Sequence, residues 1–550
     1  MFKQLRNKIA NSQTLLVGVF SLFAICISAN EATRLTAAPQ ERAQANSDEE
    51  PKVQKVILEY SRTLSFDKLI NADAQVLRGD VRFRQEGMLM FCDSAYFYES
   101  NNSLEAFGNV RMEQGDTLFV YSDYLRYDGT KRLAELRYNV KMENRDVVLL
   151  TDSLNYDRMV NVGYYFEGGV LTDPENELTS IWGQYQPDTK DARFNRDVKL
   201  VNERYVLYSD TLHYNTNTRI ADIQGPSTIV SDTSTIYTSK GWYDTNLDLA
   251  RLYERSVVVS GTQMLTGDTL FYDRNIGYGE GFSNVEVTDT TRKMTLYGQY
   301  GYYNEKSEEA FVTDSAWMME FSRVDTTYMS ADTLKTVPDS IWRVMHAIHD
   351  VRMFSNQAQA VGGLFTFTSR DSVLKMQKDP ILWNGNYQVY GDTILSYMND
   401  STIDWAHVQN FAFVASLVDS AYVDFYNQLV GKDMKAYFVD GEMRKLDVSG
   451  NVRTIFYPQE SDSTIVGQNS AESSYLRLEL KEGQQIDKLV MWPQPKGALT
   501  PVVMLTPDKL YLPDYRWYDY LRPKDKEDIF RKASRKSEDA PAKHVRRQKK

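Results

Sequence analysis

Cysteine and histidine are scarce in this sequence, and their scarcity limits the chemistry that the chain can support. The 550 residues include 2 Cys and 5 His. Cys26 lies in an apolar N-terminal segment and leaves Cys92 alone in the rest of the chain, which excludes a disulfide framework and a cysteine-based zinc site within one chain. His346 and His349 lack the H-E-x-x-H spacing of a zinc protease. The sequence therefore predicts no metal site.

The motifs of the common enzyme classes are also missing. No G-x-S-x-G nucleophile motif occurs, and Gly362-Gly363 is too short to form a phosphate-binding loop. Aspartates recur along the chain, but none forms a pair at catalytic spacing, and the glycine-rich nonapeptide loops of calcium-binding solenoids are absent. The net charge of −12 argues against nucleic acid as the main partner. We expect a protein that is not an enzyme and that needs no cofactor.

Long apolar runs are confined to the N-terminus. A positively charged start is followed by an apolar stretch at residues 14–29, which is short for a membrane-spanning helix. We interpret residues 1–29 as a signal peptide or an N-terminal anchor, so the chain is expected to be exported. Residues 30–52 have the polar composition of a linker.

Tyrosine is abundant, and its spacing is regular. The chain contains 36 Tyr, a residue that suits half-buried strands. One column of tyrosines advances in steps of 29 residues and closes with a step of 30; its members are Tyr98, Tyr127, Tyr156, Tyr185, Tyr214, Tyr243, Tyr272 and Tyr302. Repetition at a fixed interval indicates one structural unit that is copied along the chain.

Two short motifs accompany this column. The first reads S/T-D-x-L-x-Y-D and is clearest at residues 151–157 and 267–273. The second ends in valine and follows the tyrosine by 12 to 14 residues in the regular part of the chain. Its copies lie at residues 79–81, 108–110, 138–140, 168–170, 196–198, 255–257, 283–285 and 450–452.

The spacing within the motifs predicts strands. Leu154 and Tyr156 lie two residues apart and therefore share one face of a strand, as do Val140 and Met142. The Asp after the tyrosine and the Gly-Asn before the valine favour turns or bulges. No sustained apolar pattern of helical period occurs in the middle of the chain. The sequence predicts an all-β protein built from repeated antiparallel units of two strands, with a β-solenoid and an outer-membrane β-barrel as alternatives.

The repeats divide the chain into regions. Residues 53–320 carry the regular repeat, and residues 321–480 carry looser copies of the same motifs, which predicts a second, irregular β-repeat region. Residues 481–525 are rich in proline and are expected to form an irregular cap. Residues 526–550 carry runs of Lys and Arg with few apolar residues, a composition typical of a disordered tail.

The alternation of the two motifs resembles the OstA-like, LptA-type family of lipopolysaccharide transport proteins, over residues 55–320 and more loosely over residues 320–480. The resemblance implies a twisted, open β-jellyroll that binds the lipid A acyl chains of lipopolysaccharide and passes the lipid across the periplasm. It also implies association with other lipopolysaccharide-transport components by edge-strand β-augmentation, and head-to-tail self-association. The chain would be a long form of the family, in the periplasm or attached to the inner or outer membrane.

If the interior takes acyl chains, the motif residues that point inward are candidates for lining the groove. These lipid-groove candidates are Val110, Leu125, Val140, Leu154, Val170, Val198, Leu212, Val257, Leu270 and Val285. Each buried CH₂ contributes about 0.8 kcal/mol, and repetition makes neighbouring positions equivalent. Two alternatives stay open at this point: a closed core at the same positions, and an exported structural or adhesive scaffold that binds no lipid.

Overall fold

The computed structural model describes residues 54–66, 73–321, 325–339, 342–399, 403–419, 424–460 and 464–535. The chain divides into the compact units Met1–Val53 and Gln54–Lys550, and all described residues belong to the second. The predicted signal peptide or anchor, the predicted linker and residues 536–550 lie outside the described residues. In the described part of the chain, no helix is long and apolar enough to cross a membrane.

The described residues form one sheet of 36 strands, together with short 3-10 helices. The first strands are β1 (Ile57–Tyr60), β2 (Thr63–Ser65), β3 (Gln75–Gln85), β4 (Met88–Tyr98), β5 (Ser103–Gln114), β6 (Leu118–Asp128), β7 (Leu133–Asn144), β8 (Val147–Asp157), β9 (Val162–Tyr165), β10 (Gly169–Thr172), β11 (Glu177–Ser180) and β12 (Trp182–Gln186). They are followed by β13 (Asp191–Asn202), β14 (Tyr205–Asn215), β15 (Ile220–Ile223), β16 (Ser227–Ser231), β17 (Ser234–Thr238), β18 (Lys240–Asp244), β19 (Leu249–Ser260), β20 (Gln263–Asp273), β21 (Tyr278–Asp289), β22 (Met294–Asn304) and β23 (Glu309–Glu320).

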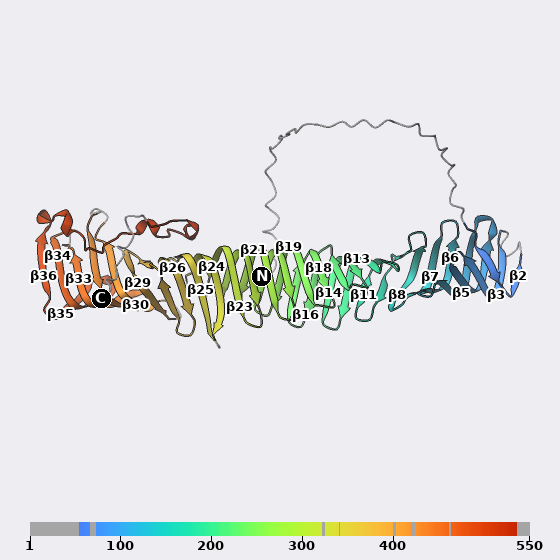
Figure 1. The fold of residues 1–550 in the computed structure, drawn as a ribbon, viewed down its shortest axis with the longest axis horizontal. Coiled ribbons are helices and arrows are strands. Elements are labelled where there is room, and N and C mark those ends of the chain that lie inside the picture. Colours follow the sequence, from blue (N-terminus) through green and yellow to red (C-terminus); the bar gives the residue numbers. More distant parts are fainter. Residues whose placement is uncertain are drawn as a thin grey trace, which may run out of the picture. The chain divides into compact units, whose positions relative to one another are not determined.

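The sheet continues with β24 (Thr327–Asp339), β25 (Trp342–Phe354), β26 (Gln359–Thr368), β27 (Val373–Gln377), β28 (Ile381–Asn384), β29 (Tyr387–Met398), β30 (Ile403–Leu417), β31 (Tyr426–Gly431), β32 (Asp433–Val439), β33 (Glu442–Phe456), β34 (Gly467–Leu480), β35 (Ile486–Trp492) and β36 (Lys496–Pro501). The 3-10 helices are η1 (Glu99–Asn101), η2 (Glu482–Gln484), η3 (Val502–Met504), η4 (Pro507–Lys509), η5 (Asp519–Leu521) and η6 (Asp528–Phe530). Successive strands pair antiparallel, as from β3 to β8, and follow one another along the sheet in chain order (Figure 1). This arrangement confirms the predicted all-β antiparallel repeat.

Alternate long strands of the regular repeat, such as β3, β5, β7, β13, β19, β21 and β23, bend at a corner formed by two residues in the left-handed conformation. In β5, Gly108 and Asn109 have φ angles of 75° and 44°, and the register with β6 shifts between Phe107 and Val110. Because the corner bends the strand, the halves on its two sides turn their buried faces toward each other. The motif that was predicted as a turn or bulge is therefore a bulge within one strand.

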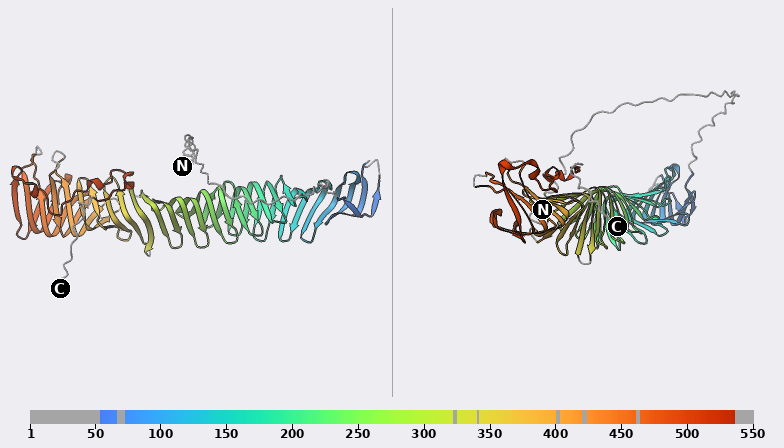
Figure 2. Two further views of the ribbon diagram at one scale, coloured as in Figure 1. Left: turned by 45° about the horizontal axis from the view of Figure 1, so that its top comes forward. Right: turned by 60° about the vertical axis from the view of Figure 1, so that its left-hand side comes forward.

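The half-strands form two layers, which can be followed in the two views of Figure 2. The tyrosine layer holds half-strands such as 103–107 of β5 and the tyrosine end of β6, with which it pairs. The valine layer holds half-strands such as 110–114 of β5 and its partner in β6. A continuous core of buried apolar side chains lies between the layers and extends from Val56 to Leu476.

In several places the chain passes from one layer to the other without a continuous strand, and the corner divides the passage into two short strands. For example, β9 and β10 both pair with β8, one in each layer, and β15 and β16 both pair with β14. The strand pairing does not break where the regular repeat ends, because β23 pairs with β24. The same antiparallel pairing continues through the looser repeats to β34.

The chain changes character after β34. Both β35 and β36 pair with β34, and the side chains of Ile486, Leu489 and Leu499 on these two strands are exposed. Residues 502–535 contain no strand and form a strap on the outer face of the valine layer. Part of the segment assigned in the sequence to a disordered tail belongs to this strap, and its Ile529 is buried.

Buried glutamines hold the strap to the sheet. In β29, Val389 packs against the interior core, whereas its neighbours Gln388 and Tyr390 face the strap. Side-chain amides donate hydrogen bonds of 2.8–2.9 Å to strap carbonyl groups from Gln468 to Lys509, from Gln428 to Leu510 and from Gln388 to Arg516. Because the glutamine carbonyl oxygens also accept backbone N–H groups, the strap is bound through its main chain.

Candidate functional site

The apolar interior between the two layers is the candidate site, because it contains most of the residues that were predicted to line a groove. Eight of these residues are at most 2% exposed: Val110, Leu125, Val140, Leu154, Val198, Leu212, Leu270 and Val285. The valines belong to the valine layer and the leucines to the tyrosine layer, so the two walls of the interior contribute alternately.

Val257 does not face the interior, contrary to the prediction. The corner of β19 is formed by Glu254 and Arg255, which both have positive φ angles, so the first inward position after the corner belongs to Ser256. Ser256 is 0% exposed, and Val257 points to the outer face. The valine motif is displaced here by one residue relative to the corner.

Val170 is displaced in the same way. Gly169 pairs with Thr151, the residue that Val140 pairs with from the other side of β8. Gly169 therefore occupies the position that corresponds to Val140, and the alternation of the strand turns Val170 outward. The buried side chain of this half-strand is Leu171, at 0% exposure.

The tyrosine column lines the interior at the edge opposite to the corners. Its buried members are Tyr127, Tyr156, Tyr185, Tyr214, Tyr243 and Tyr272. At both ends the structural column departs from the predicted one, because Phe97 and Tyr303 are the buried residues beside Tyr98 and Tyr302. Phe97 pairs with Leu104, the residue that Tyr127 pairs with from the other side.

Tyrosine hydroxyl groups join the two layers along a line of polar contacts that we call the seam. Tyr127 donates a hydrogen bond to the side-chain oxygen of Gln85, at the end of β3 in the valine layer. The amide of Gln85 donates in turn to the carbonyl oxygen of Gly129, at 2.8 Å. One repeat later, the hydroxyl of Tyr156 lies 3.2 Å from the side-chain oxygen of Gln114.

The seam continues along the regular repeats. Tyr214 donates to Asp173 at 2.5 Å and accepts from the amide of Asn176 at 2.8 Å. Ion pairs bridge the same edge; they join Arg132 to Glu86, Arg219 to Glu175 and Arg204 to Asp248. These contacts link residues that are 38 or more positions apart in the chain, because each joins opposite layers rather than neighbouring strands.

The polar residues of the valine layer that contact the seam tyrosines were not predicted from the sequence. Polar residues end the valine-layer half-strands, or directly follow them, at intervals of 29 or 30 residues: Gln85, Gln114, Asn144, Asp173 and Asn202. This interval matches the repeat, so the column was detectable as a second period. A single polar residue at a strand end commonly marks a turn, so only its recurrence at the repeat interval indicates that it has a further role.

Burial favours the protonated form of the tyrosines in the column. Burial raises the pKa of Tyr185 to about 12, and it also raises the pKa of Tyr127. For Tyr214, burial and the neighbouring Asp173 carboxylate both raise the pKa. These hydroxyl groups therefore stay protonated well above neutral pH.

The two layers are packed against each other in this structure. The inward groove candidates are at most 2% exposed, and a cavity of only about 10 Å³ lies between the layers beside Leu265 and Tyr272. That volume suits about one water molecule. Among the described residues, no group of His, Cys, Asp or Glu is arranged to hold a metal ion. The interior therefore provides apolar contacts. One of its edges is closed by the hydrogen bonds of the seam, which can break.

Residues 53–210 and 227–326 match the family described as OstA-like protein. These residues carry the regular repeats, the corners and the greater part of the seam. No curated protein matches the chain.

Proposed function

Because this chain belongs to the OstA-like family, we propose that it is a non-enzymatic carrier that binds lipopolysaccharide and helps to move it across the periplasm to the outer membrane. The lipid A acyl chains would lie between the tyrosine layer and the valine layer. The observation that supports this role best is the continuous apolar interior, to which each repeat adds leucine and valine on the same two walls. A lipid that moves from one repeat to the next meets an equivalent surface, so no position along the path traps it.

Entry of acyl chains requires the two layers to separate, because the groove candidates are buried. At the corners the covalent chain itself joins the two layers, whereas the seam is held by hydrogen bonds that each contribute a net stabilisation of about 1 kcal/mol. An acyl chain of a dozen CH₂ groups gains about 10 kcal/mol when it leaves water for an apolar site. That gain exceeds the cost of opening a few seam contacts, so we assign the entry path to the seam.

The edges of the sheet are the proposed contact points for partners. Among the described strands, β1 pairs only with β3, and β35 and β36 pair only with β34. Unpaired N–H and C=O groups at such edges can accept a strand of another lipopolysaccharide-transport component or of a second copy. The exposed side chains of Ile486 and Leu489 on β35 add apolar area to the contact.

Photocrosslinking to lipopolysaccharide tests the carrier role. A diazirine analogue of leucine, which keeps the size of the side chain, replaces Leu125, Leu154 or Leu212 in the interior, and a diazirine probe at Asp157 or Asp273 serves as the control in the turns. We expect label transfer to lipopolysaccharide from the interior positions and none from the turns. Deacylated lipopolysaccharide should not compete.

The opposite outcome is equally informative. Absence of transfer from every interior position in the folded protein would contradict the proposal. The packed interior would then be a closed core, and an exported scaffold without lipid binding would be the better account.

A further inference from the structure

Several corners carry a hydrogen bond between an aspartate and an asparagine that follows it by 16 residues. Asparagine amides donate to aspartate carboxylates from Asn109 to Asp93 at 2.8 Å, and from Asn139 to Asp123 and Asn284 to Asp268 at 2.6 Å. The aspartate is the Asp of the tyrosine motif, and the asparagine precedes the valine of the second motif. Each of these corner pairs gives a partner to a carboxylate that lies at the surface.

The corner pair is missing in the middle of the regular repeats. Pro226 follows Asp210 by 16 residues and has no side-chain donor. Asp197 takes the place of the asparagine in β13, and the residue 16 positions before it is Ile181. Within the described part of the chain, the side chains of Asp197 and Asp210 make neither a hydrogen bond nor an ion pair. Two exposed carboxylates are therefore left free on neighbouring strands.

The next corner is also altered. Arg255 follows Ser239 by 16 residues, and its guanidinium group bonds to Glu286 at 2.5 Å and to the carbonyl oxygen of Asn284 at 2.6 Å. The side chain of Ser239 is exposed and has no partner among the described residues. Three consecutive corners thus present polar groups that the protein itself does not use.

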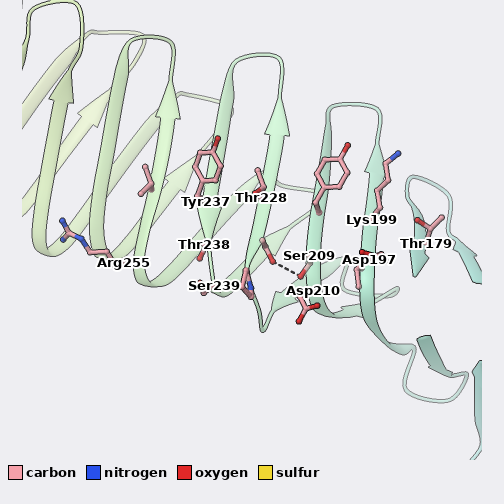
Figure 3. A pocket seen from close by; sticks show the side chains of 15 residues that line it. Thr179, Asp197, Lys199, Ser209, Asp210, Thr228, Tyr237, Thr238, Ser239 and Arg255 are labelled. Carbon is pink, nitrogen blue, oxygen red and sulfur yellow. Dashed lines mark hydrogen bonds between the residues drawn. The ribbon is translucent and has the colours of Figure 1, made fainter. Parts of the chain in front are cut away.

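These groups border a hollow on the outer face of the valine layer, which Figure 3 shows. The hollow has a volume of about 790 Å³. Asp197, Asp210 and Ser239 lie toward the corner side, and Thr228 and Tyr237 rise from the strands beside them (Figure 3). We call this surface the outer hollow; the packed interior lies on the other side of the valine layer.

Two tyrosines stand in one row across the outer hollow. Tyr208 of β14 pairs with Thr228 of β16, which pairs with Tyr237 of β17, so the two tyrosines lie two strands apart, or about 10 Å. They are 48% and 49% exposed, although nothing in the fold requires large aromatic rings to face solvent at these positions. The small side chain of Thr228 between them leaves space above the sheet.

The combination of these groups specifies the chemistry of a ligand. Exposed aromatic rings pack against the apolar C–H face of a pyranose ring, and free carboxylates accept hydrogen bonds from sugar hydroxyl groups. The distance between Tyr208 and Tyr237 is comparable with two sugar rings joined end to end. The charged groups that border the hollow balance each other, because the carboxylates of Asp197 and Asp210 face the exposed ammonium group of Lys199 and the guanidinium group of Arg255. Arg255 is already paired with Glu286, so a neutral ligand fits the hollow better than a strongly charged one.

We propose that the outer hollow is a binding site for a neutral oligosaccharide. Tyr208 and Tyr237 stack on two sugar rings that are separated by one intervening ring, and Asp197 and Asp210 accept hydrogen bonds from hydroxyl groups. The site faces away from the interior, so the proposal does not depend on whether the interior carries a lipid. It goes beyond lipid transport by giving the protein a second, carbohydrate-directed surface.

The test uses the full-length protein and an array of immobilised neutral and acidic oligosaccharides, followed by titration with the neutral oligosaccharide that binds best. Tyr208→Ala and Tyr237→Ala should each lower its affinity about fivefold, since one lost ring contact is worth about 1 kcal/mol. Tyr208→Phe keeps the ring and should bind like the original protein. Asp210→Ala removes an acceptor and should also weaken binding.

Tyr121→Ala is the matched control, because Tyr121 lies on the same outer face of the valine layer in β6, outside the hollow. It should leave affinity unchanged. Three results would overturn the proposal: no oligosaccharide bound by the array, a preference for acidic oligosaccharides, or equal affinities of the Tyr208→Ala and Tyr121→Ala variants. All these side chains are on the outer face, so each variant is expected to fold. Thermal unfolding of each variant checks this.

Discussion

The hydroxyl of Tyr127 donates a hydrogen bond to the side-chain oxygen of Gln85, 42 residues earlier in the chain, and joins the tyrosine layer to the valine layer. Arg158 donates to the same hydroxyl at 2.8 Å, so the tyrosine connects two polar groups at the edge of an apolar interior. The contact recurs one repeat later between Tyr156 and Gln114. The repeat thus specifies the edge that closes the interior as well as the walls.

Removal of one seam hydroxyl should weaken the closed state. We expect Tyr127→Phe to lower the free energy of unfolding by about 1 kcal/mol, because Gln85 and Arg158 each lose a hydrogen-bond partner. Tyr121→Phe, on the outer face of β6, should change it by less than about 0.5 kcal/mol. Urea denaturation of the three proteins measures the difference. Equal midpoints for the two variants would show that the seam does not hold the layers together.

Truncation of side chains should separate inward from outward groove candidates. Leu212→Ala removes a residue that is 0% exposed and should cost about 2–5 kcal/mol of unfolding free energy, through lost burial and the cavity left behind. Val257→Ala, on the outer face, should cost less than about 1 kcal/mol. Denaturation curves check both values. A large loss for Val257→Ala would contradict the position of the corner in β19.

The corner should depend on glycine where both the backbone and the available space require it. Gly108 has a φ of 75°, and an added Cβ would lie 2.6 Å from the carboxylate of Asp93. Gly115, at a φ of 64°, has nothing within 4 Å of an added Cβ. Gly115→Ala should cost about 1 kcal/mol from backbone strain alone, and Gly108→Ala should cost more. Thermal unfolding ranks the two; the reverse order would show that the corner tolerates a side chain.

Alkaline pH should destabilise the protein through the buried tyrosines. An unfolded tyrosine loses its proton near pH 10, whereas the pKa of folded Tyr185 is raised to about 12. Between these values the folded state binds more protons than the unfolded state, so the free energy of unfolding falls as pH rises through this window and is constant below it. Tyr185→Phe should reduce this dependence. Urea midpoints that stay level from about pH 9 to about pH 11.5 would contradict the burial of the tyrosines.

The strap should loosen when one of its glutamines is removed. Gln388→Ala deletes the acceptor of the Tyr518 N–H group, at 2.7 Å, and the donor to the Arg516 carbonyl. We expect faster hydrogen exchange of the Tyr518 amide, with little change at Leu512, whose amide is held by Gln428. Exchange followed by mass spectrometry measures both. Unchanged exchange at Tyr518 would mean that packing alone holds the strap.

The strands and the walls of the interior were predictable because they depend on local alternation. Leu154 and Tyr156 share a face at a spacing of two residues, and the period of 29 residues copies that face along the chain. The corner was harder to locate. It is marked by two residues with positive φ, and in β19 these are Glu254 and Arg255, which carry no glycine or asparagine signal. The expectation for Val257 therefore failed by one position.

The seam and the strap were not predictable from local patterns, because they join segments that are far apart in the chain. Gln85 and Tyr127 meet only after the strands have folded into two layers. The glutamines that bind the strap, Gln388, Gln428 and Gln468, recur at intervals of 40 residues in the irregular region. Without a partner in view, each of these residues reads as an ordinary polar side chain at a strand end.

The measurement that tests the central claim most directly is the distance between the two layers at the seam, with and without lipopolysaccharide. Spin labels are placed at Gly87, where an added side chain meets nothing within 4 Å, and at exposed Lys131; the ion pair between Arg132 and Glu86 shows that these turns face each other across the seam. A second pair, Lys131 with exposed Met159, lies within the tyrosine layer and is the control. Both native cysteines are replaced.

Pulsed electron paramagnetic resonance then gives the two distances. If acyl chains enter between the layers, lipopolysaccharide lengthens the distance from position 87 to position 131 and leaves the distance from position 131 to Met159 unchanged. Lipopolysaccharide that binds without any change in the first distance would contradict entry through the seam. Absence of binding would contradict the carrier role itself.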